Sequence, residues 1–277
     1  MNITSALKKQ EDGTIDIAVT IPWSVVSKTK DEIIEEHVKE ATTPGFRKGK
    51  VPKKIVEQNL SQDHLREDIL RKLLPLAYSE AVKEQKITPI ISPRVHVQKL
   101  EDGKDWQFSA QTCEMPHINL GNYKDEVKKI TAKAKIVVSG NKTPQANFEE
   151  ITNVLLQTAT FTIPKVILDQ EVEKLLSQTL DEIKKLGLSL EQYLASTKRT
   201  TESLRQEYAK KAEGDVKLEF ILSEIAKQEN IQVEDKEIEE AIAAAKTETE
   251  KQNLSQNRYL LASIIRQQKT LDFIRNL

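Results

Sequence analysis

The chain has 277 residues, long enough for two domains that each have a hydrophobic core. Its 42 Lys and Arg residues balance 43 Asp and Glu residues, which excludes a global electrostatic attraction to DNA or to an anionic membrane. Charged residues make up 31% of the chain and aromatic residues only 5%, a composition that favours an elongated helical protein over a compact enzyme.

Cysteine content and hydropathy indicate the compartment. Cys113 is the only cysteine, so the sequence excludes an intrachain disulfide and a cysteine-based zinc site and indicates a reducing environment. The N-terminus lacks the apolar run of a secretory signal, and the uncharged stretch 151–164 is shorter than the roughly 20 residues needed to span a bilayer. We therefore expect a cytoplasmic protein with no membrane partner.

The first part of the chain mixes strand and helix patterns. Residues 15–21 alternate apolar and polar after a Glu11-Asp12-Gly13 turn, which predicts the second arm of a hairpin. Alternation around the turn at 101–105 predicts another hairpin. Three helices are expected between the hairpins, over 22–42, 52–59 and 62–84. These patterns predict an α+β domain over residues 1–116.

The pattern changes after Met115-Pro116. Residues 124–138 alternate and are rich in lysine, so we interpret residues 117–146 as a linker arm. From Asn147 onward every segment has helical periodicity, and Ser189 with Gln192 forms a candidate capping box. The expected long helices begin at Pro164, Thr201, Asp235 and Ser255. We expect residues 147–277 to form an elongated all-α domain.

The segment P-G-F-R-K-G-K-V-P-K-K, from Pro44 to Lys54, concentrates positive charge in a chain whose charges otherwise balance. The window 41–56 contains no acidic residue and five basic ones: Arg47, Lys48, Lys50, Lys53 and Lys54. Two glycines and two prolines should fix an irregular backbone that presents Phe46 and Arg47 at a tip. The pattern predicts a docking tip, and a solvated basic loop without a partner is the alternative that composition leaves open.

Other site patterns do not fit. Gly45 and Gly49 enclose three residues and Lys50 is followed by Val51, so the loop lacks the spacing and the magnesium-ligating hydroxyl of a P-loop. The histidines are not spaced as metal ligands; they are His37, His64, His96 and His117. Cys113 lies in a predicted strand without a partnered base, which favours a structural thiol over a nucleophile. We expect no cofactor, no metal and no catalytic residue.

The run G-F-R-K-G-K-V-P, residues 45–52, matches the ribosome-binding signature of bacterial trigger factors, and the chain resembles that family. Looser similarity to its C-terminal chaperone domain lies in 161–172 and 208–240. The resemblance implies an α+β ribosome-binding domain followed by a helical chaperone domain. It also implies a partner protein at the nascent-chain exit tunnel, adjacent ribosomal RNA, and unfolded polypeptides as clients. The ribosome-binding residues that it implies are Gly45, Phe46, Arg47, Lys48, Gly49, Lys50 and Pro52.

The middle of the chain departs from the family pattern. Family members normally carry an FKBP-like prolyl isomerase domain there, but too few residues separate the linker arm from Pro164 to hold one. The resemblance without this domain therefore implies a chaperone that acts without ATP, assists folding and export, and is not an enzyme. Two alternatives stay open, a prolyl isomerase as in full-length family members and a ribosome- or RNA-binding module without chaperone action.

Overall fold

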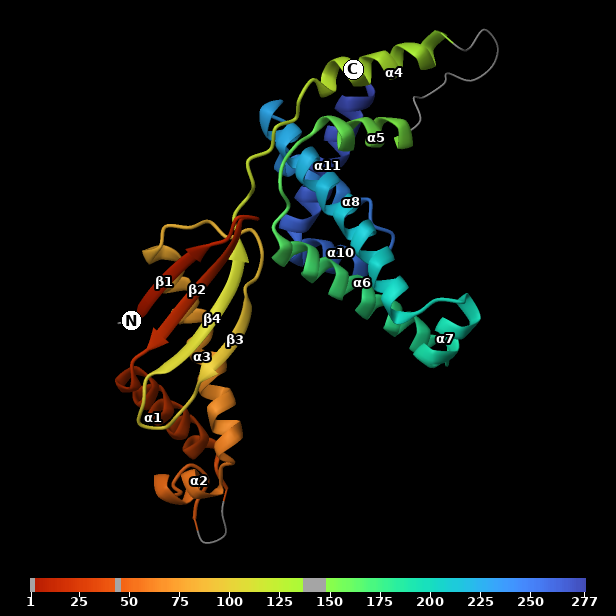
Figure 1. The fold of residues 1–277 in the computed structure, drawn as a ribbon. Coiled ribbons are helices and arrows are strands. Elements are labelled where there is room, and N and C mark those ends of the chain that lie inside the picture. Colours follow the sequence, from red (N-terminus) through yellow and green to blue (C-terminus); the bar gives the residue numbers. More distant parts are fainter. Residues whose placement is uncertain (1–2, 43–45, 137–147) are drawn as a thin grey trace. The chain divides into compact units, whose positions relative to one another are not determined.

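The computed structural model describes residues 3–42, 46–136 and 148–277, and it divides into two compact units (Figure 1). Unit 1 comprises Met1–Met115 and Pro164–Val166, and unit 2 comprises Pro116–Ile163 and Ile167–Leu277. The division between 115 and 116 lies next to the end that the sequence predicts for the first domain.

Unit 1 contains a four-stranded antiparallel sheet with the strand order β1-β2-β4-β3 (Figure 1). Its strands are β1 (Thr4–Lys9), β2 (Thr14–Ile21), β3 (Arg94–Lys99) and β4 (Trp106–Cys113). The turn between β1 and β2 contains Gly13 at φ +88°, a conformation that glycine adopts without steric cost. Both predicted hairpins are therefore confirmed, and β2 and β4 pair directly in the centre of the sheet.

Three helices complete unit 1: α1 (Trp23–Glu40), α2 (Lys53–Asn59) and α3 (Gln62–Glu84). The alternation of β2 sends its apolar side chains to one face, where they form a core with the apolar stripes of α1 and α3. Fully buried members of this core include Ile17, Ile34, Leu73 and Trp106. The α+β prediction is confirmed, and α3 continues through Pro75.

Unit 2 is helical. Its helices are α4 (Tyr123–Ile136), α5 (Phe148–Thr158), α6 (Lys165–Lys185, whose first two residues belong to unit 1), α7 (Leu190–Thr197), α8 (Thr201–Gln228), α9 (Asp235–Ala243), α10 (Glu248–Gln256) and α11 (Arg258–Arg275). The longest helix, α8, buries eight residues and contacts α5 and α11. Lys217 of α8 donates to the Leu156 carbonyl at 2.8 Å, which attaches the C-terminal turn of α5 through a cation. The predicted all-α fold of this part is confirmed.

Caps explain where several helices begin. Ser189 accepts from the Gln192 N–H, and the Gln192 side chain accepts from the Ser189 N–H, so the predicted capping box is present. The long helix that the sequence predicts to begin at Asp235 is instead two short helices, α9 and α10. Thr247 begins α10 with a capping box to Glu250, which ends helical continuity from α9.

The predicted linker arm contains a packed helix. The stretch 124–136 belongs to α4, which contacts α5 and α11, while residues 137–147 lie outside the described part of the chain. Tyr123, Val127 and Thr131 are spaced by four and are all buried, so one helical stripe packs while Lys128 and Lys129 are exposed. Tyr123 also donates to Glu229 at 3.2 Å. The interpretation of this stretch as an alternating linker segment was wrong over α4. The buried face of α4 contains few large apolar residues, so its helical period is hard to recognise in the sequence.

None of the helices within the described ranges combines the length and the apolar character of a membrane span.

We predict that Val127→Ala lowers the free energy of unfolding of unit 2 by about 1 to 3 kcal/mol, because it removes buried methyl groups from the α4 interface. Lys128→Ala, at an exposed neighbouring position, should change it by less than about 0.5 kcal/mol. Chemical denaturation followed by circular dichroism measures both. Equal effects of the two substitutions would mean that α4 is an unattached arm.

Candidate functional site

The basic loop joins the C-terminus of α1 to the N-terminus of α2 (Figure 1). Helix α1 ends at Glu40, and the next residue, Ala41, has an extended backbone while its N–H still donates to the carbonyls of His37 and Val38. Helix α2 begins after Pro52, whose carbonyl accepts from the N–H groups of Ile55 and Val56. Two helix ends therefore hold the loop. Of the seven predicted site residues, Gly45 lies outside the described residues.

A tight turn shapes the loop. The Lys50 N–H donates to the Arg47 carbonyl at 2.9 Å, and Gly49 at the third position has φ +78°, as a type II turn requires. The Gly49 N–H donates to the Ala41 carbonyl at 3.2 Å, which joins the turn to the end of α1. A Cβ atom on Gly49 would lie 3.2 Å from the Lys39 carbonyl oxygen. Glycine is required here both by its conformation and by this close approach.

The predicted tip residues face solvent. Phe46 is 41% exposed, an unusual position for a large aromatic side chain, and Arg47, Lys48 and Lys50 are exposed beside it. Among the described residues, these three cations form no ion pair, so their charge is available to a partner. Val51, directly after them, is only 2% exposed. The loop thus combines a charged tip containing an aromatic ring with an apolar base.

Lys53 differs from the other basic residues. Its Nζ lies 3.0 Å from Asp31 Oδ1 and 3.6 Å from Glu35 Oε1, both on α1, and the hydrogen bond to Asp31 raises the pKa of Lys53. Glu57 of α2 pairs with Lys30 of α1 at 2.9 Å. The sequence shows Lys53 only as one of five basic residues in the window 41–56, and this attachment was not predicted. The signal was the spacing of Asp31 and Glu35, which places both carboxylates on one face of α1.

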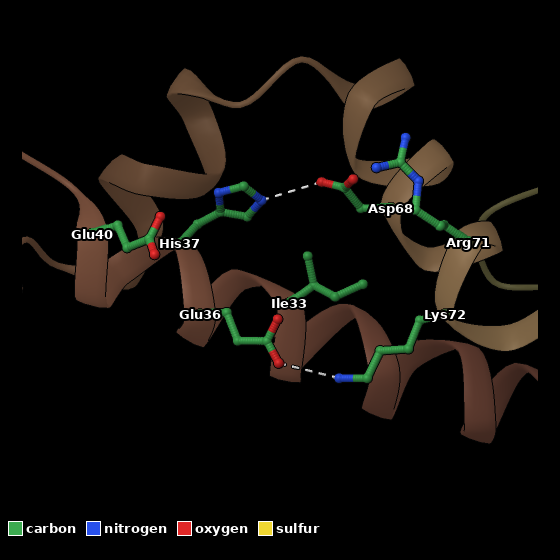
Figure 2. A pocket seen from close by; sticks show the side chains of 7 residues that line it. All are labelled: Ile33, Glu36, His37, Glu40, Asp68, Arg71 and Lys72. Carbon is green, nitrogen blue, oxygen red and sulfur yellow. Dashed lines mark hydrogen bonds and ion pairs between the residues drawn. The ribbon is translucent and has the colours of Figure 1, made fainter. Parts of the chain in front are cut away.

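A groove of about 370 Å³ lies between α1 and α3 (Figure 2). Charges of both signs line it and pair across it: His37 Nε2 lies 3.3 Å from Asp68 Oδ2, and Lys72 Nζ lies 3.2 Å from Glu36 Oε1. Lys72 also contacts Glu32 at 3.1 Å, and hydrogen bonds to these two carboxylates raise the pKa of Lys72. These ion pairs connect α1 to α3, and they concentrate neither positive nor negative charge in the groove.

The Cys113 thiol is not activated as a nucleophile. Cys113 is fully buried, and desolvation raises the pKa of its thiol to about 11, so the nucleophilic thiolate is not populated at neutral pH. Within the ranges that the structure describes, no cluster of three or more His, Cys, Asp or Glu side chains is placed to hold a metal ion.

Exposed apolar side chains gather at two places in unit 2. Leu186 is 72% exposed and Leu188 is 41% exposed, both between α6 and α7, and α7 itself has no buried residue. On α11, Tyr259 is 90% exposed, with Leu260 and Ile264 also exposed. Large contiguous apolar patches on soluble proteins often mark binding surfaces, so these residues are candidates for such a surface. Sequence periodicity could not separate these residues from core positions, because their spacing also fits helix packing.

Comparisons with known proteins agree with these features. Residues 1–151 match the family model described as bacterial trigger factor protein, and residues 123–276 match the model of its C-terminus. The two matches overlap, so no segment between them is left for a further domain.

Relatives match over less than half of this chain. The chain is 40% identical over 122 residues to the trigger factor of Staphylococcus epidermidis, which covers 44% of this chain and 28% of that protein. It is 38% identical over 131 residues to the trigger factor of Staphylococcus carnosus, covering 47% and 30%. The chain therefore spans under a third of these curated relatives. A solved structure from work on promiscuous substrate recognition by the trigger factor chaperone superimposes with a TM-score of 0.63 at 14% identity, covering 98% of this chain and 99% of that one.

We predict that Gly49→Ala destabilises unit 1 by more than Gly103→Ala does. Both glycines have positive φ, +78° and +82°, so alanine costs each about 1 kcal/mol of conformational strain. Only at Gly49 would the new methyl group approach a backbone oxygen, because nothing lies within 4 Å of a Cβ on Gly103. Chemical denaturation of the two variants measures the difference. Equal losses would show that the close approach to Lys39 carries no cost.

Proposed function

We propose that this chain, which belongs to the bacterial trigger factor family, is a chaperone that docks on the ribosome through residues 45–52 and protects unfolded polypeptides without ATP. The observation that carries the proposal is the exposed tip at Phe46, Arg47 and Lys48, held on a fixed turn beside a buried base. No prolyl isomerase domain lies between the two matched parts of the chain, so the proposed activity is binding and not catalysis.

The tip is suited to a protein surface near the nascent-chain exit. The Arg47 guanidinium can donate two parallel hydrogen bonds to a carboxylate, and Phe46 can fill an apolar recess beside it. Lys48 and Lys50 would contribute a positive field toward adjacent ribosomal RNA. Aromatic and arginine side chains of this kind supply most of the binding free energy at protein interfaces.

Client binding is assigned to the exposed apolar groups of unit 2. The pair Leu186 and Leu188 and the α11 group of Tyr259, Leu260 and Ile264 offer contacts to extended apolar segments without a deep pocket. Val51 follows Lys50 at the position where a nucleotide-binding P-loop has a Ser or Thr hydroxyl. The loop is therefore not built to bind ATP, which supports action without it. We place this activity in the cytoplasm, where ribosomes and emerging chains meet.

We predict that replacing Phe46, Arg47 and Lys48 by alanine weakens binding to purified ribosomes at least about 30-fold, because it removes an aromatic and an arginine anchor. Co-sedimentation over a range of ribosome concentrations measures the affinity. The control variant Lys8→Ala, Lys99→Ala removes the same amount of positive charge from exposed strand positions of unit 1 and should bind like the wild type. If the triple variant sediments like the control, the docking assignment fails.

The proposed client binding gives a further prediction. The double substitution Leu186→Ser, Leu188→Ser should at least halve the protection that each mole of this protein gives an aggregating test protein. Both side chains are exposed, so the substitutions should shift the free energy of unfolding by less than about 0.5 kcal/mol. Light scattering without ATP measures protection, and Val97→Ser in unit 1, also at an exposed apolar residue, is the control. Full protection by the double variant would leave a ribosome-associated module without client contacts at α6 and α7.

A further inference from the structure

Helix α2 is too short to hold its own position. It has seven residues, and isolated helices of this length are unstable in water. Its one buried residue is Val56, and it contacts α1. The orientation of α2 therefore depends on what attaches it to α1. Because α2 begins directly after Pro52, its orientation also sets where the second end of the basic loop lies.

Ion pairs of opposite polarity join α2 to α1 at two places. At the N-terminal end of α2, the Lys53 ammonium faces two α1 carboxylates, Asp31 and Glu35. One turn later, the Glu57 carboxylate faces the Lys30 ammonium of α1. Turning or shifting α2 along α1 would bring like charges together, so these pairs favour a single placement of the short helix.

Two adjacent lysines at the start of α2 allow general attraction by positive charge to be distinguished from a specific contact with α1. Lys53 and Lys54 are consecutive in the first turn of α2 and carry the same charge. Lys53 is directed toward α1 carboxylates, whereas Lys54 is exposed and forms no ion pair with any residue that the structure describes. If net positive charge alone attracted the partner, the two lysines would be equivalent.

We propose that Lys53 is a positioning residue for docking: it holds α2 against α1, fixes the second end of the loop and does not itself contact the partner. This inference rests on the proposed docking function of the loop. With the Gly49 to Ala41 hydrogen bond holding the first end, the clamp presents Phe46 and Arg47 in one arrangement. Preorganisation of this kind strengthens binding because less conformational freedom is lost on association.

The expected effect is modest and measurable. Exposed ion pairs change an equilibrium by roughly 1.5- to 5-fold, and Lys53 contacts two carboxylates. Lys53→Glu, which turns attraction into repulsion, should therefore weaken ribosome binding about fivefold. Lys54→Glu, with the same change of net charge, should weaken it by less than about twofold, through the long-range field alone.

A charge-conserving swap decides between positioning and contact. Asp31→Lys with Lys53→Glu rebuilds the closest pair with reversed polarity and should bind ribosomes within about twofold of the wild type. The matched control, Asp31→Lys with Lys54→Glu, has the same net charge but cannot rebuild the pair, and it should stay about as weak as Lys53→Glu. Co-sedimentation of the full chain measures each affinity. Hydrogen exchange at the Val56 and Glu57 amides reports the attachment of α2 without ribosomes.

The outcomes are distinct. Restored affinity and restored amide protection in the swap, together with an unchanged denaturation midpoint, support the clamp. If the swap stays as weak as Lys53→Glu while protection returns, Lys53 contacts the partner and the inference is overturned. It is also overturned if Lys53→Glu and Lys54→Glu weaken binding equally. If the wild type does not bind ribosomes, the proposed function itself fails, which is a separate result from a failure of the swap.

Discussion

The attachment of both loop ends to α1 is the constraint on which the docking tip depends. An unpaired cationic loop would sample many conformations, and ordering each residue on binding costs about 1 to 2 kcal/mol of backbone entropy. Here the Gly49 N–H is bonded to the end of α1, and Val51 is buried at the start of the segment that leads into α2. The tip can therefore be exposed and charged without being conformationally free.

The core of unit 1 supports this arrangement, because α1 is fixed before the loop begins. Apolar residues of β2 bury one face of the sheet beneath α1 and α3, and pairs such as His37 with Asp68 connect the two helices beyond the core. Unit 2 also has buried apolar residues, such as Leu155, Ile221 and Ile274, but it leaves other apolar residues uncovered near α7 and on α11. One unit thus presents a small charged tip and the other presents exposed apolar side chains, as the proposed docking and client binding require.

Much of this could be predicted from local pattern. Alternation gave both hairpins of unit 1, and the Ser189 capping box was readable because it depends on residues three positions apart. The features that the sequence did not predict depend on contacts between distant residues or on helix faces with few apolar residues. The partners of Lys53 lie on another helix, α4 is amphipathic through only a few buried residues such as Val127, and exposure of Leu186 depends on which faces neighbouring helices cover. Of the predicted site, the exposure of Phe46 and Arg47 agrees with the expected tip, and their role in docking stays a prediction.

The most direct test is site-specific crosslinking from the tip. A photo-crosslinking amino acid in place of Phe46, in the full chain mixed with purified ribosomes, should form a covalent adduct with a protein of the large subunit near the nascent-chain exit. The same amino acid at Glu101, in the exposed turn between β3 and β4, serves as the control and should give none. Adducts from both positions alike, or from neither while the protein still co-sediments, would contradict docking through this loop.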